Sequence, residues 1–375
     1  MNEPSFETPC MGPAGKPAGR DALPWPHARA AELTRRLAAL AASETITWTL
    51  LPSHETAFIR YFSDASSDDY RRLEGFCFRP YSPEADLSAV DVAIRMTHGD
   101  DNSGELFRLK ERFPQIIVAN WLWDNHVSQL NNLRTAFAAD INFPSHNYAA
   151  TYLLNPAAAM GTHVPACAAQ WSAAEAEAAV QAEYGRERSP KTLVNYVDYA
   201  WSWRSPLLRR LQAEVVEAEV LLMPPDDRSR YFSRTPAERL AEWQRYKSTL
   251  ILPVDRDLST RVFDALLAGQ VVIAPRMIAD FDAVIPPAEQ ARLGIIRIGD
   301  YELPTLRQAM LIAARTFDAM GREGVVARHQ FVASGHMIHH RMHTILRTIS
   351  PRHRSSATLR LSTEPQVPPC LVWSR

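Results

Sequence analysis

The sequence predicts two α/β domains in tandem, each built on a parallel sheet, with the carboxyl ends of their strands facing a shared cleft. Apolar, strand-like segments alternate with amphipathic helical segments in both halves of the chain, which is typical of βαβ units. The alternation weakens between 151 and 190, where Pro, Gly and Ala accumulate, so we place the domain boundary there. The length of 375 residues is sufficient for two hydrophobic cores. We expect a disordered tail at 1–26, an N-terminal domain at 27–165, a C-terminal domain at 166–350 and a disordered tail at 351–375.

The composition excludes several classes of protein. Apolar residues make up 46% of the chain, which indicates a globular protein. The 41 Lys and Arg residues are balanced by 42 Asp and Glu residues, whereas a nucleic-acid-binding protein would carry a basic surplus. The four cysteines form no CxxC pair, and no apolar run reaches the length of a signal peptide or a membrane span. We therefore expect a cytoplasmic protein that binds no nucleic acid and does not cross a membrane.

In the N-terminal half the predicted elements run from 27 to 145. The segment HARAAELTRRLAALAAS is an amphipathic helix with Leu33, Leu37 and Leu40 on one stripe. The segment SGELFRLKERFP predicts a helix that ends before Pro114. The predicted strands are TITWTLL, VDVAIRM, QIIVANWLW and AADINFPS.

In the C-terminal half the alternation is more regular. The predicted strands are KTLVNYVDY, EAEVLLMPP, STLILPV, QVVIAP and LGIIRI. The predicted helices are SAAEAEAAVQAEYG, SPLLRRLQAE, TPAERLAEWQRY, STRVFDALLAG, LPTLRQAMLIAARTFDAM and MIHHRMHTILRTI. Thr235 and Ser259 are expected N-caps, Pro236 suits the first helical position, and Gly269 suits the residue that follows a helix end. Ligands of such parallel sheets bind at the carboxyl ends of the strands.

The first candidate phosphate site is the turn YVDYAWSWRSPLLRRL. Arg204 stands just before a predicted helix start, where free backbone N–H groups and the positive end of the helix dipole attract anions. A guanidinium there would add a two-pronged contact to a phosphate. The alternative is a surface arginine on a loop, with Trp201 and Trp203 serving only to pack it.

The second candidate is the turn STRVFDALLAG. Ser259 and Thr260 offer hydroxyl and N–H groups at the helix start, and Arg261 lies in the first turn, where a cation opposes the helix dipole. A bound anion would explain that placement. Asp264 follows three residues later on the same helix face, where a carboxylate could accept ribose hydroxyls. The alternative is a surface Arg–Asp pair of small energy.

The stretch STRVFDALLAGQVVIAP resembles the signature of glycosyltransferases of the GT-B fold, which have two Rossmann-like domains. It is most similar to the CgeB-like branch of the group 1 glycosyltransferases. Arg261, Phe263, Ala265 and Gly269 match the pattern, while Asp264 replaces the usual Glu. The acidic partner expected eight residues before Asp264 is Arg256 here, which leaves the stereochemical outcome open. The resemblance covers about 190–349 and includes YVDYAWSWRSPLLRRL and the closing segment VVARHQFVASGHMIHHRMHTIL.

The resemblance implies a nucleotide-diphospho-sugar donor held by the C-terminal domain. It assigns Asp264 to the ribose, and it assigns Arg204, Arg261 and the backbone of Ser259 and Thr260 to the diphosphate. Fixed cations and helix dipoles would stabilise the charge that grows on the leaving nucleoside diphosphate. The fold requires no divalent metal, so we expect neither a metal nor another cofactor.

The acceptor, whose identity the sequence does not reveal, should bind to the N-terminal domain. His98 and Asp100 follow one predicted strand and His126 follows the next, so they are candidates for the group that takes the acceptor proton. The alternative for each is an ordinary turn. Trp121 and Trp123 alternate onto one face, where we expect them to fill the core.

One further cluster attracts attention near the C-terminus. His336, His340 and His343 recur at a spacing that can bind a metal, but no carboxylate or cysteine joins them in the sequence. A basic helix end near the donor phosphates is the preferred interpretation.

The sequence therefore predicts a metal-independent glycosyltransferase. Two alternatives stay open at this point: an epimerase or hydrolase of a nucleotide sugar in the same fold, and a non-catalytic module that binds a nucleotide sugar.

Overall fold

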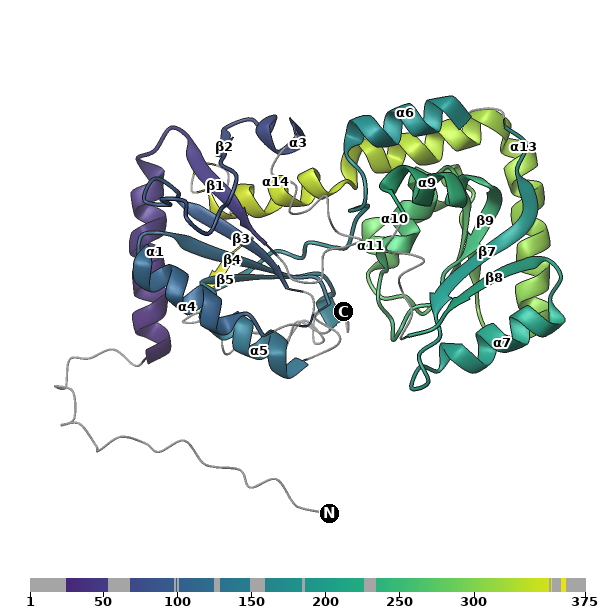
Figure 1. The fold of residues 1–375 in the computed structure, drawn as a ribbon, viewed down its shortest axis with the longest axis horizontal. Helices are drawn as coiled ribbons and strands as arrows, with labels where there is room; N and C mark the ends of the chain where they lie inside the picture. Colours follow the sequence, from purple (N-terminus) through teal and green to yellow (C-terminus); the bar gives the residue numbers. More distant parts are fainter. Residues whose placement is uncertain are drawn as a thin grey trace, which may run out of the picture.

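A computed structural model describes residues 25–52, 68–97, 99, 101–124, 129–148, 159–183, 186–225, 234–350, 352 and 359–361. Two sheets organise the chain, one in each half, as Figure 1 shows. Residues 1–24 of the expected N-terminal tail lie outside the described residues. No helix in the described part is long and apolar enough to cross a membrane.

The N-terminal sheet has seven strands in the order β12-β6-β5-β4-β3-β1-β2. The strand pairs are parallel, as predicted, except that β12 runs antiparallel to β6. Its strands are β1 (Ile46–Leu51), β2 (Phe76–Phe78), β3 (Val92–Thr97), β4 (Ile117–Leu122), β5 (Ile141–Pro144), β6 (Ala159–Gly161) and β12 (Leu359–Leu361). The carboxyl ends of the parallel strands therefore lie at one edge of the sheet.

The C-terminal sheet has five parallel strands in the order β11-β10-β9-β7-β8. They are β7 (Ser189–Val197), β8 (Ala218–Met223), β9 (Tyr246–Leu250), β10 (Val271–Pro275) and β11 (Ile296–Ile298). All five were predicted from their apolar runs. The predicted class of two Rossmann-like domains with parallel sheets is thus confirmed.

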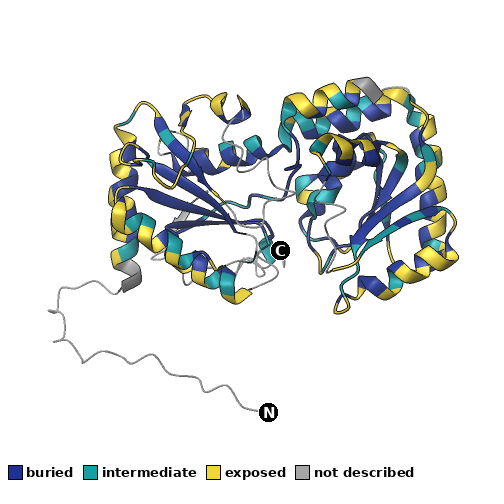
Figure 2. Cartoon of the chain, in the orientation of Figure 1, coloured by how far each residue is buried: buried dark blue, intermediate teal, exposed yellow. Residues whose placement is uncertain are grey.

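Helices cover both faces of both sheets. In the N-terminal domain, residues of α4 and α5 join one core cluster, while residues of α1 and α14 join the cluster on the opposite face. In the C-terminal domain, α7 and α13 pack on one face and α9 and α10 on the other. Figure 2 shows the buried strands inside these partly exposed helices. The helices are α1 (Trp25–Ala41), α3 (Asp68–Arg71), α4 (Ser103–Arg112), α5 (Gln129–Ala138), α6 (Ala173–Glu183), α7 (Arg204–Glu214), α9 (Pro236–Gln244), α10 (Thr260–Leu267), α11 (Phe281–Val284), α12 (Pro287–Leu293), α13 (Leu303–Gly335) and α14 (Ile338–Ile349).

The local helix signals in the C-terminal domain are confirmed. Thr235 forms a capping box with Glu238, and the Ser259 side chain accepts a hydrogen bond from the Arg261 N–H. Gly269 adopts a φ of 78° after α10, and a Cβ there would lie 2.6 Å from Val325 Cγ1. Glycine is therefore required at this helix end for both its conformation and its size.

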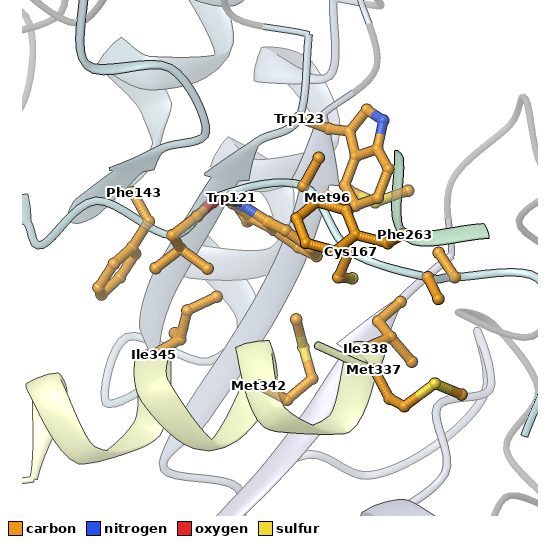
Figure 3. Packing of buried hydrophobic residues seen from close by; sticks show 14 of the residues in the cluster. Met96, Trp121, Trp123, Phe143, Cys167, Phe263, Met337, Ile338, Met342 and Ile345 are labelled. Atoms are coloured by element: carbon orange, nitrogen blue, oxygen red, sulfur yellow. Dashed lines mark hydrogen bonds between the residues drawn. The ribbon is translucent and has the colours of Figure 1, made fainter. Parts of the chain in front are cut away.

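The last helix, α14, follows the C-terminal domain in sequence but packs on the N-terminal domain. α13, which is kinked at Gly321, lies on the C-terminal sheet, whereas α14 packs against β6 and α3 of the N-terminal domain. Figure 3 shows Met342 and Ile345 of α14 close to Trp121 and Phe143 of the strands. The sequence division at 350 does not capture this crossing, and the expected tail 351–375 contributes β12.

Two stretches of chain connect the domains side by side. Ala168 and Met337 form a parallel bridge, and the Ala168 N–H donates to the His336 carbonyl at 2.9 Å. Arg341 is buried and donates from Nε to the Pro165 carbonyl at 2.9 Å. The apolar core continues through this junction, because one cluster includes Trp121, Cys167 and Phe263.

At the amino ends of the N-terminal strands a buried carboxylate holds two helices. Asp140 accepts hydrogen bonds from Arg36 of α1 at 2.8 Å and from Lys110 of α4 at 2.6 Å, and its Oδ2 accepts from the Val118 N–H at 2.8 Å. Opposite charges paired in this way offset much of the desolvation of each group.

At the amino ends of the C-terminal strands a buried arginine pairs with no carboxylate of the described residues. Arg328 is fully buried and donates to the carbonyls of Gly269 at 2.9 Å and Leu293 at 3.1 Å. Its Nη2 has no hydrogen-bond partner among the described residues, and burial lowers the pKa of this guanidinium to about 9. These bonds tie the kinked α13 to the end of α10.

Candidate functional site at the facing strand ends

The carboxyl edges of the two sheets contact each other. Asn147, which follows β5, donates from its backbone N–H to Asp280 Oδ2 at 2.9 Å, and Asp280 follows β10. The Arg256 guanidinium, in the loop after β9, lies 5.1 Å from the ring centroid of Tyr148. The loops after β9 and β10 are joined by a bond from the Ala279 N–H to the Arg256 carbonyl at 2.8 Å. Strand-end loops from both domains therefore meet at one place.

Arg204 is the first residue of α7 and lies at this edge. Its Nη1 donates to the Leu252 carbonyl at 3.1 Å and its Nε to the Ser202 hydroxyl at 3.2 Å. Burial is the main cause that lowers the pKa of Arg204, and the nearby Arg261 lowers it further, while Tyr196 and Asp257 oppose the change. The side chain is thus held by neutral groups beside a second cation.

Arg261 lies in the first turn of α10 and faces the same tyrosine. The Cζ atoms of Arg261 and Arg204 lie 4.6 and 4.9 Å from the ring centroid of Tyr196. In the described part of the chain, neither guanidinium forms an ion pair with a carboxylate, and the Arg261 guanidinium forms no hydrogen bond. Two cations share one aromatic ring at the starts of two helices.

The two hydroxyl residues before Arg261 are already engaged. The Ser259 hydroxyl accepts from the Arg261 N–H at 3.3 Å, which is the capping bond of α10. The Thr260 hydroxyl donates to the Cys167 carbonyl at 2.5 Å and ties the helix start to the segment that links the domains. What these residues retain for a ligand is the oriented start of the helix rather than free hydroxyl groups.

Asp264 lies deeper than the sequence suggested. Its side chain is fully buried, and Oδ2 accepts from Gln170 Nε2 at 2.7 Å. Gln170 in turn accepts from Arg239 Nε at 2.9 Å. Asp264 Oδ1 is buried with no hydrogen-bond partner in the described part of the chain. Burial raises the pKa of this carboxyl to about 7. Its assignment to the ribose stays a prediction.

Exposed aromatic side chains border the two arginines. Trp203 packs against Tyr301 at a centroid distance of 4.9 Å and donates from Nε1 to the Val254 carbonyl at 2.8 Å. Trp201 is 69% exposed and stacks on Tyr199 at 5.3 Å. The sequence-based alternative, in which Trp201 serves only as packing, does not fit so exposed a side chain.

The three candidates for the acceptor-side base, His98, Asp100 and His126, lie outside the described residues. Their roles stay predictions. Trp121 and Trp123 are both buried and pack edge to face at 4.8 Å, so they fill the core as expected.

The C-terminal histidines are distributed among different contacts. His336 stacks on Phe263, and its Nδ1 accepts from Arg341 at 2.8 Å. The backbone N–H of Met337 donates to Nδ1 of His340 at 3.2 Å. His343 lies edge-on to Phe76. Among the described residues, no three His, Cys, Asp or Glu side chains are grouped to hold a metal ion.

The structure also brings together a pair that the sequence analysis missed. His163 Nε2 lies 2.8 Å from the Ser145 carbonyl and 3.9 Å from Asp280 Oδ2. His163 follows β6, a three-residue strand inside the Pro- and Ala-rich stretch where no strand was predicted. Asp280 has a φ of 61°, a left-handed conformation that is uncommon for a residue other than glycine. Recognition of β6 as a strand would have placed His163 at the carboxyl edge.

No protein-family model and no curated protein matches the sequence. Among solved structures, the chain is similar to the N-terminal domain of trehalose-6-phosphate phosphatase from Candida albicans, with a TM-score of 0.49 and 10% identity over 83% of this chain and 97% of that one. It is similar to a trehalose 6-phosphate synthase from Burkholderia multivorans, with a TM-score of 0.42 and 12% identity over 85% and 81%. It is also similar to UGT89C1 of Arabidopsis thaliana complexed with quercetin, with a TM-score of 0.32 and 12% identity over 82% and 89%. These are low-identity likenesses of fold with TM-scores below 0.5, and nothing about activity rests on them.

Proposed function

We propose that the protein is a glycosyltransferase of the GT-B type that transfers a sugar from a nucleotide-diphospho-sugar donor held by the C-terminal domain. The observation that carries this proposal is the pair Arg204 and Arg261, which flank the Tyr196 ring without a carboxylate ion pair in the described part. The resemblance of the α10 stretch to donor-binding sequences supports the same assignment.

The energetic reason is that neither guanidinium has a carboxylate ion pair in the described part of the chain, and Asp257 and Asp264 act on them only from a greater distance. Two guanidiniums beside one ring repel each other, and the burial of Arg204 adds a desolvation cost. A diphosphate would bring two or more negative charges and enough oxygens to accept bonds from both planar forks. The starts of α7 and α10 direct their positive dipole ends toward the same edge. A dianionic ligand thus offsets a cost that the protein carries without it.

These groups would also serve the reaction. The bond between the sugar and the diphosphate breaks with its electron pair moving to the leaving nucleoside diphosphate. Positive groups already in position stabilise that charge without reorganising. Guanidiniums and helix dipoles supply this stabilisation in the proposed mechanism, so we expect turnover to persist in the presence of EDTA.

Asp264 is the proposed ribose ligand. Its buried Oδ1 has no donor in the described part of the chain, and a ribose hydroxyl would supply one. Asp264→Ala should then weaken nucleoside diphosphate binding by about 1.5–3 kcal/mol, as expected for a hydrogen bond to a charged group. An unchanged calorimetric affinity would remove Asp264 from the site.

The central experiment compares phosphate-dependent with phosphate-independent binding. Calorimetry with UDP, GDP, ADP and CDP, and with the matching nucleosides, identifies the base that the protein prefers. For that base, Arg204→Met and Arg261→Met should each weaken diphosphate binding by about 10- to 100-fold and leave nucleoside binding nearly unchanged. Arg328→Met removes a buried arginine at the opposite edge of the same sheet and serves as the matched control.

The outcomes separate the alternatives. Equal losses for nucleoside and diphosphate would contradict the phosphate assignment, and an equal loss in Arg328→Met would show a general effect on the domain. Release of nucleoside diphosphate from UDP-, GDP- or ADP-hexoses that depends on an added acceptor supports a transferase, whereas release that is equally fast with water alone supports the hydrolase. Binding without any release would support the non-catalytic module instead.

A further inference from the structure

His163 has a defined tautomer because of its surroundings. Its Nε2 lies 2.8 Å from the Ser145 backbone carbonyl, which can only accept a hydrogen bond. In the neutral ring Nε2 therefore carries the hydrogen, and Nδ1 keeps a free lone pair. No residue in the described part of the chain bonds to Nδ1, and the side chain is 16% exposed. The ring thus offers a basic atom that the protein itself does not use.

The imidazole ring of His163 lies at the carboxyl ends of the strands, where parallel sheets bind their ligands. His163 follows β6, whose carboxyl end lies beside that of β5, and Ser145 follows β5 directly. Asp280, 3.9 Å from Nε2, follows β10 of the other sheet. The loop that carries Asp280 is bonded to the loop of Arg256, which lies next to the Arg261 helix start. His163 is therefore on the acceptor side of the proposed donor site, where the two domains meet.

We propose that His163, in place of His98, Asp100 or His126, is the general base of the transfer reaction and takes the acceptor proton at Nδ1. This inference rests on the proposed function. In the step, the acceptor oxygen forms a bond to the anomeric carbon and its proton passes to Nδ1. The bond from that carbon to the donor phosphate oxygen breaks, and its electron pair leaves with the nucleoside diphosphate. The imidazolium later returns the proton to solvent.

Asp280 is the positioning residue of this arrangement. Its Oδ2 accepts from the Asn147 N–H at 2.9 Å, so a carboxylate from the C-terminal domain is fixed near the ring. That carboxylate stabilises the imidazolium formed during the step. Burial is the main cause that lowers the pKa of His163, Arg341 lowers it further, and Asp280 and the Ser145 carbonyl oppose them. A lowered pKa keeps the resting ring neutral at pH 7, as a base requires.

The first test needs no substrate. Nitrogen-15 NMR of histidine side chains distinguishes the two neutral tautomers, and the signal of His163 is the one lost in His163→Gln. The expected form at pH 7 is neutral with the hydrogen on Nε2. A ring with the hydrogen on Nδ1, or a charged ring at pH 7, overturns the proposal whether or not a donor has been identified.

The second test measures turnover and binding together. Gln at 163 still offers an N–H to the Ser145 carbonyl but has no basic lone pair. With the UDP-, GDP- or ADP-hexose that the wild type turns over, His163→Gln should reduce kcat about 100- to 10,000-fold while nucleoside diphosphate affinity changes less than twofold. His329→Gln is the matched control, because His329 is a buried histidine whose Nδ1 likewise contacts a backbone carbonyl, that of Leu267 at 3.2 Å.

The results distinguish this proposal from the proposed function. Normal kcat in His163→Gln overturns the base assignment and leaves the transferase intact. Loss of nucleotide binding in the same variant shows that the ring holds the fold or the donor and also overturns it. A wild type that binds no nucleotide removes both proposals. Asp280→Asn should lower kcat by a smaller factor with KM for the donor unchanged, and a change in KM alone would remove Asp280 from its positioning role.

Discussion

In the N-terminal domain the buried Arg36 and the half-buried Lys110 share the carboxylate of Asp140, whereas in the C-terminal domain the buried Arg328 bonds to backbone carbonyls. Arg261 differs from all three, because its guanidinium forms no hydrogen bond in the described part of the chain. A cation without a carboxylate is therefore not in itself evidence of a ligand. What marks Arg261 is the combination of unmet hydrogen-bonding capacity, a second cation on the same ring, and a helix start.

The largest effect should come from breaking the N-terminal charge cluster. Asp140→Ala would leave two cations without their buried partner and should lower the free energy of unfolding by about 3–5 kcal/mol. Burial alone would raise the pKa of Asp140, but Lys110 and Arg36 hold it below its ordinary value. This stability is therefore present above the ordinary carboxyl pKa and is lost as the pH falls through the lowered one.

Urea unfolding measures this effect, with Glu219→Ala as the control. Glu219 pairs with Lys191 on the surface, where both side chains are exposed, so its loss should cost less than about 1 kcal/mol. Similar losses of unfolding free energy in the two variants would contradict the expectation that a buried, paired carboxylate stabilises the fold more than a surface carboxylate does.

The next effect concerns the carboxylate at the domain junction. The pKa of Asp264 is raised to about 7, against about 3.9 in an unfolded chain. The folded state binds more protons between these values, so the contribution of Asp264 is complete below about pH 4 and is lost as the pH rises to about 7. Asn cannot ionise. The stability of the wild type relative to Asp264→Asn should therefore fall by roughly 2–3 kcal/mol between pH 5 and pH 8.

Urea unfolding at the two pH values gives this difference directly. Parallel pH dependence in the wild type and Asp264→Asn would mean that the carboxyl titrates alike in the folded and unfolded chain. Burial would then have no net effect on the pKa of Asp264.

A smaller effect sharpens the role of Arg261. Arg261→Lys keeps the positive charge but lacks the planar fork, so diphosphate affinity should fall about tenfold with the folding stability unchanged. Calorimetry with the preferred nucleoside diphosphate measures it. Full affinity in the lysine variant would indicate that the site reads charge alone and not the geometry of the phosphate.

The smallest effect on the free energy of unfolding is expected for Arg328, which bonds to backbone carbonyls. Arg328→Met removes bonds to the Gly269 and Leu293 carbonyls, but it also removes the cost of burying an unpaired charge. The two changes should nearly offset each other, within about 1 kcal/mol in urea unfolding. A loss as large as that of Asp140→Ala would show that carbonyl bonds stabilise a buried guanidinium as well as a carboxylate does.

Most of the fold could be predicted because its elements carry strong local signals. The capping box of Thr235 and the apolar runs of β7 and β10 are examples. β2, β6 and β12 were not predicted, because each has three residues, too few for periodicity to show, and none lies in an apolar run like the LGIIRI that reveals the equally short β11. The side of the molecule on which α14 packs could not be predicted either, because an apolar stripe does not specify the sheet that it covers.

The candidate site was predicted in part for the same reason. Arg204 and Arg261 lie next to helix starts that the sequence marks, whereas His163 depends on the short β6. The depth of Asp264 is set by Gln170 and Arg239, which are distant in sequence and meet the carboxylate only in the folded chain. The spacing along α10 predicted the helix face on which Asp264 lies, but it could not predict which residues of other segments pack against that face.

The return of α14 to the first domain has a consequence for synthesis. Strands β1 to β6 of the N-terminal sheet are translated first, but α14, the helix that covers Trp121 and Phe143, is translated only after strands β7 to β11 of the other sheet. Until then an apolar surface of the nascent chain stays uncovered, and such surfaces are prone to aggregate or to recruit chaperones. The first domain therefore cannot complete its fold before α14 has been translated, which happens only after strands β7 to β11 of the second domain.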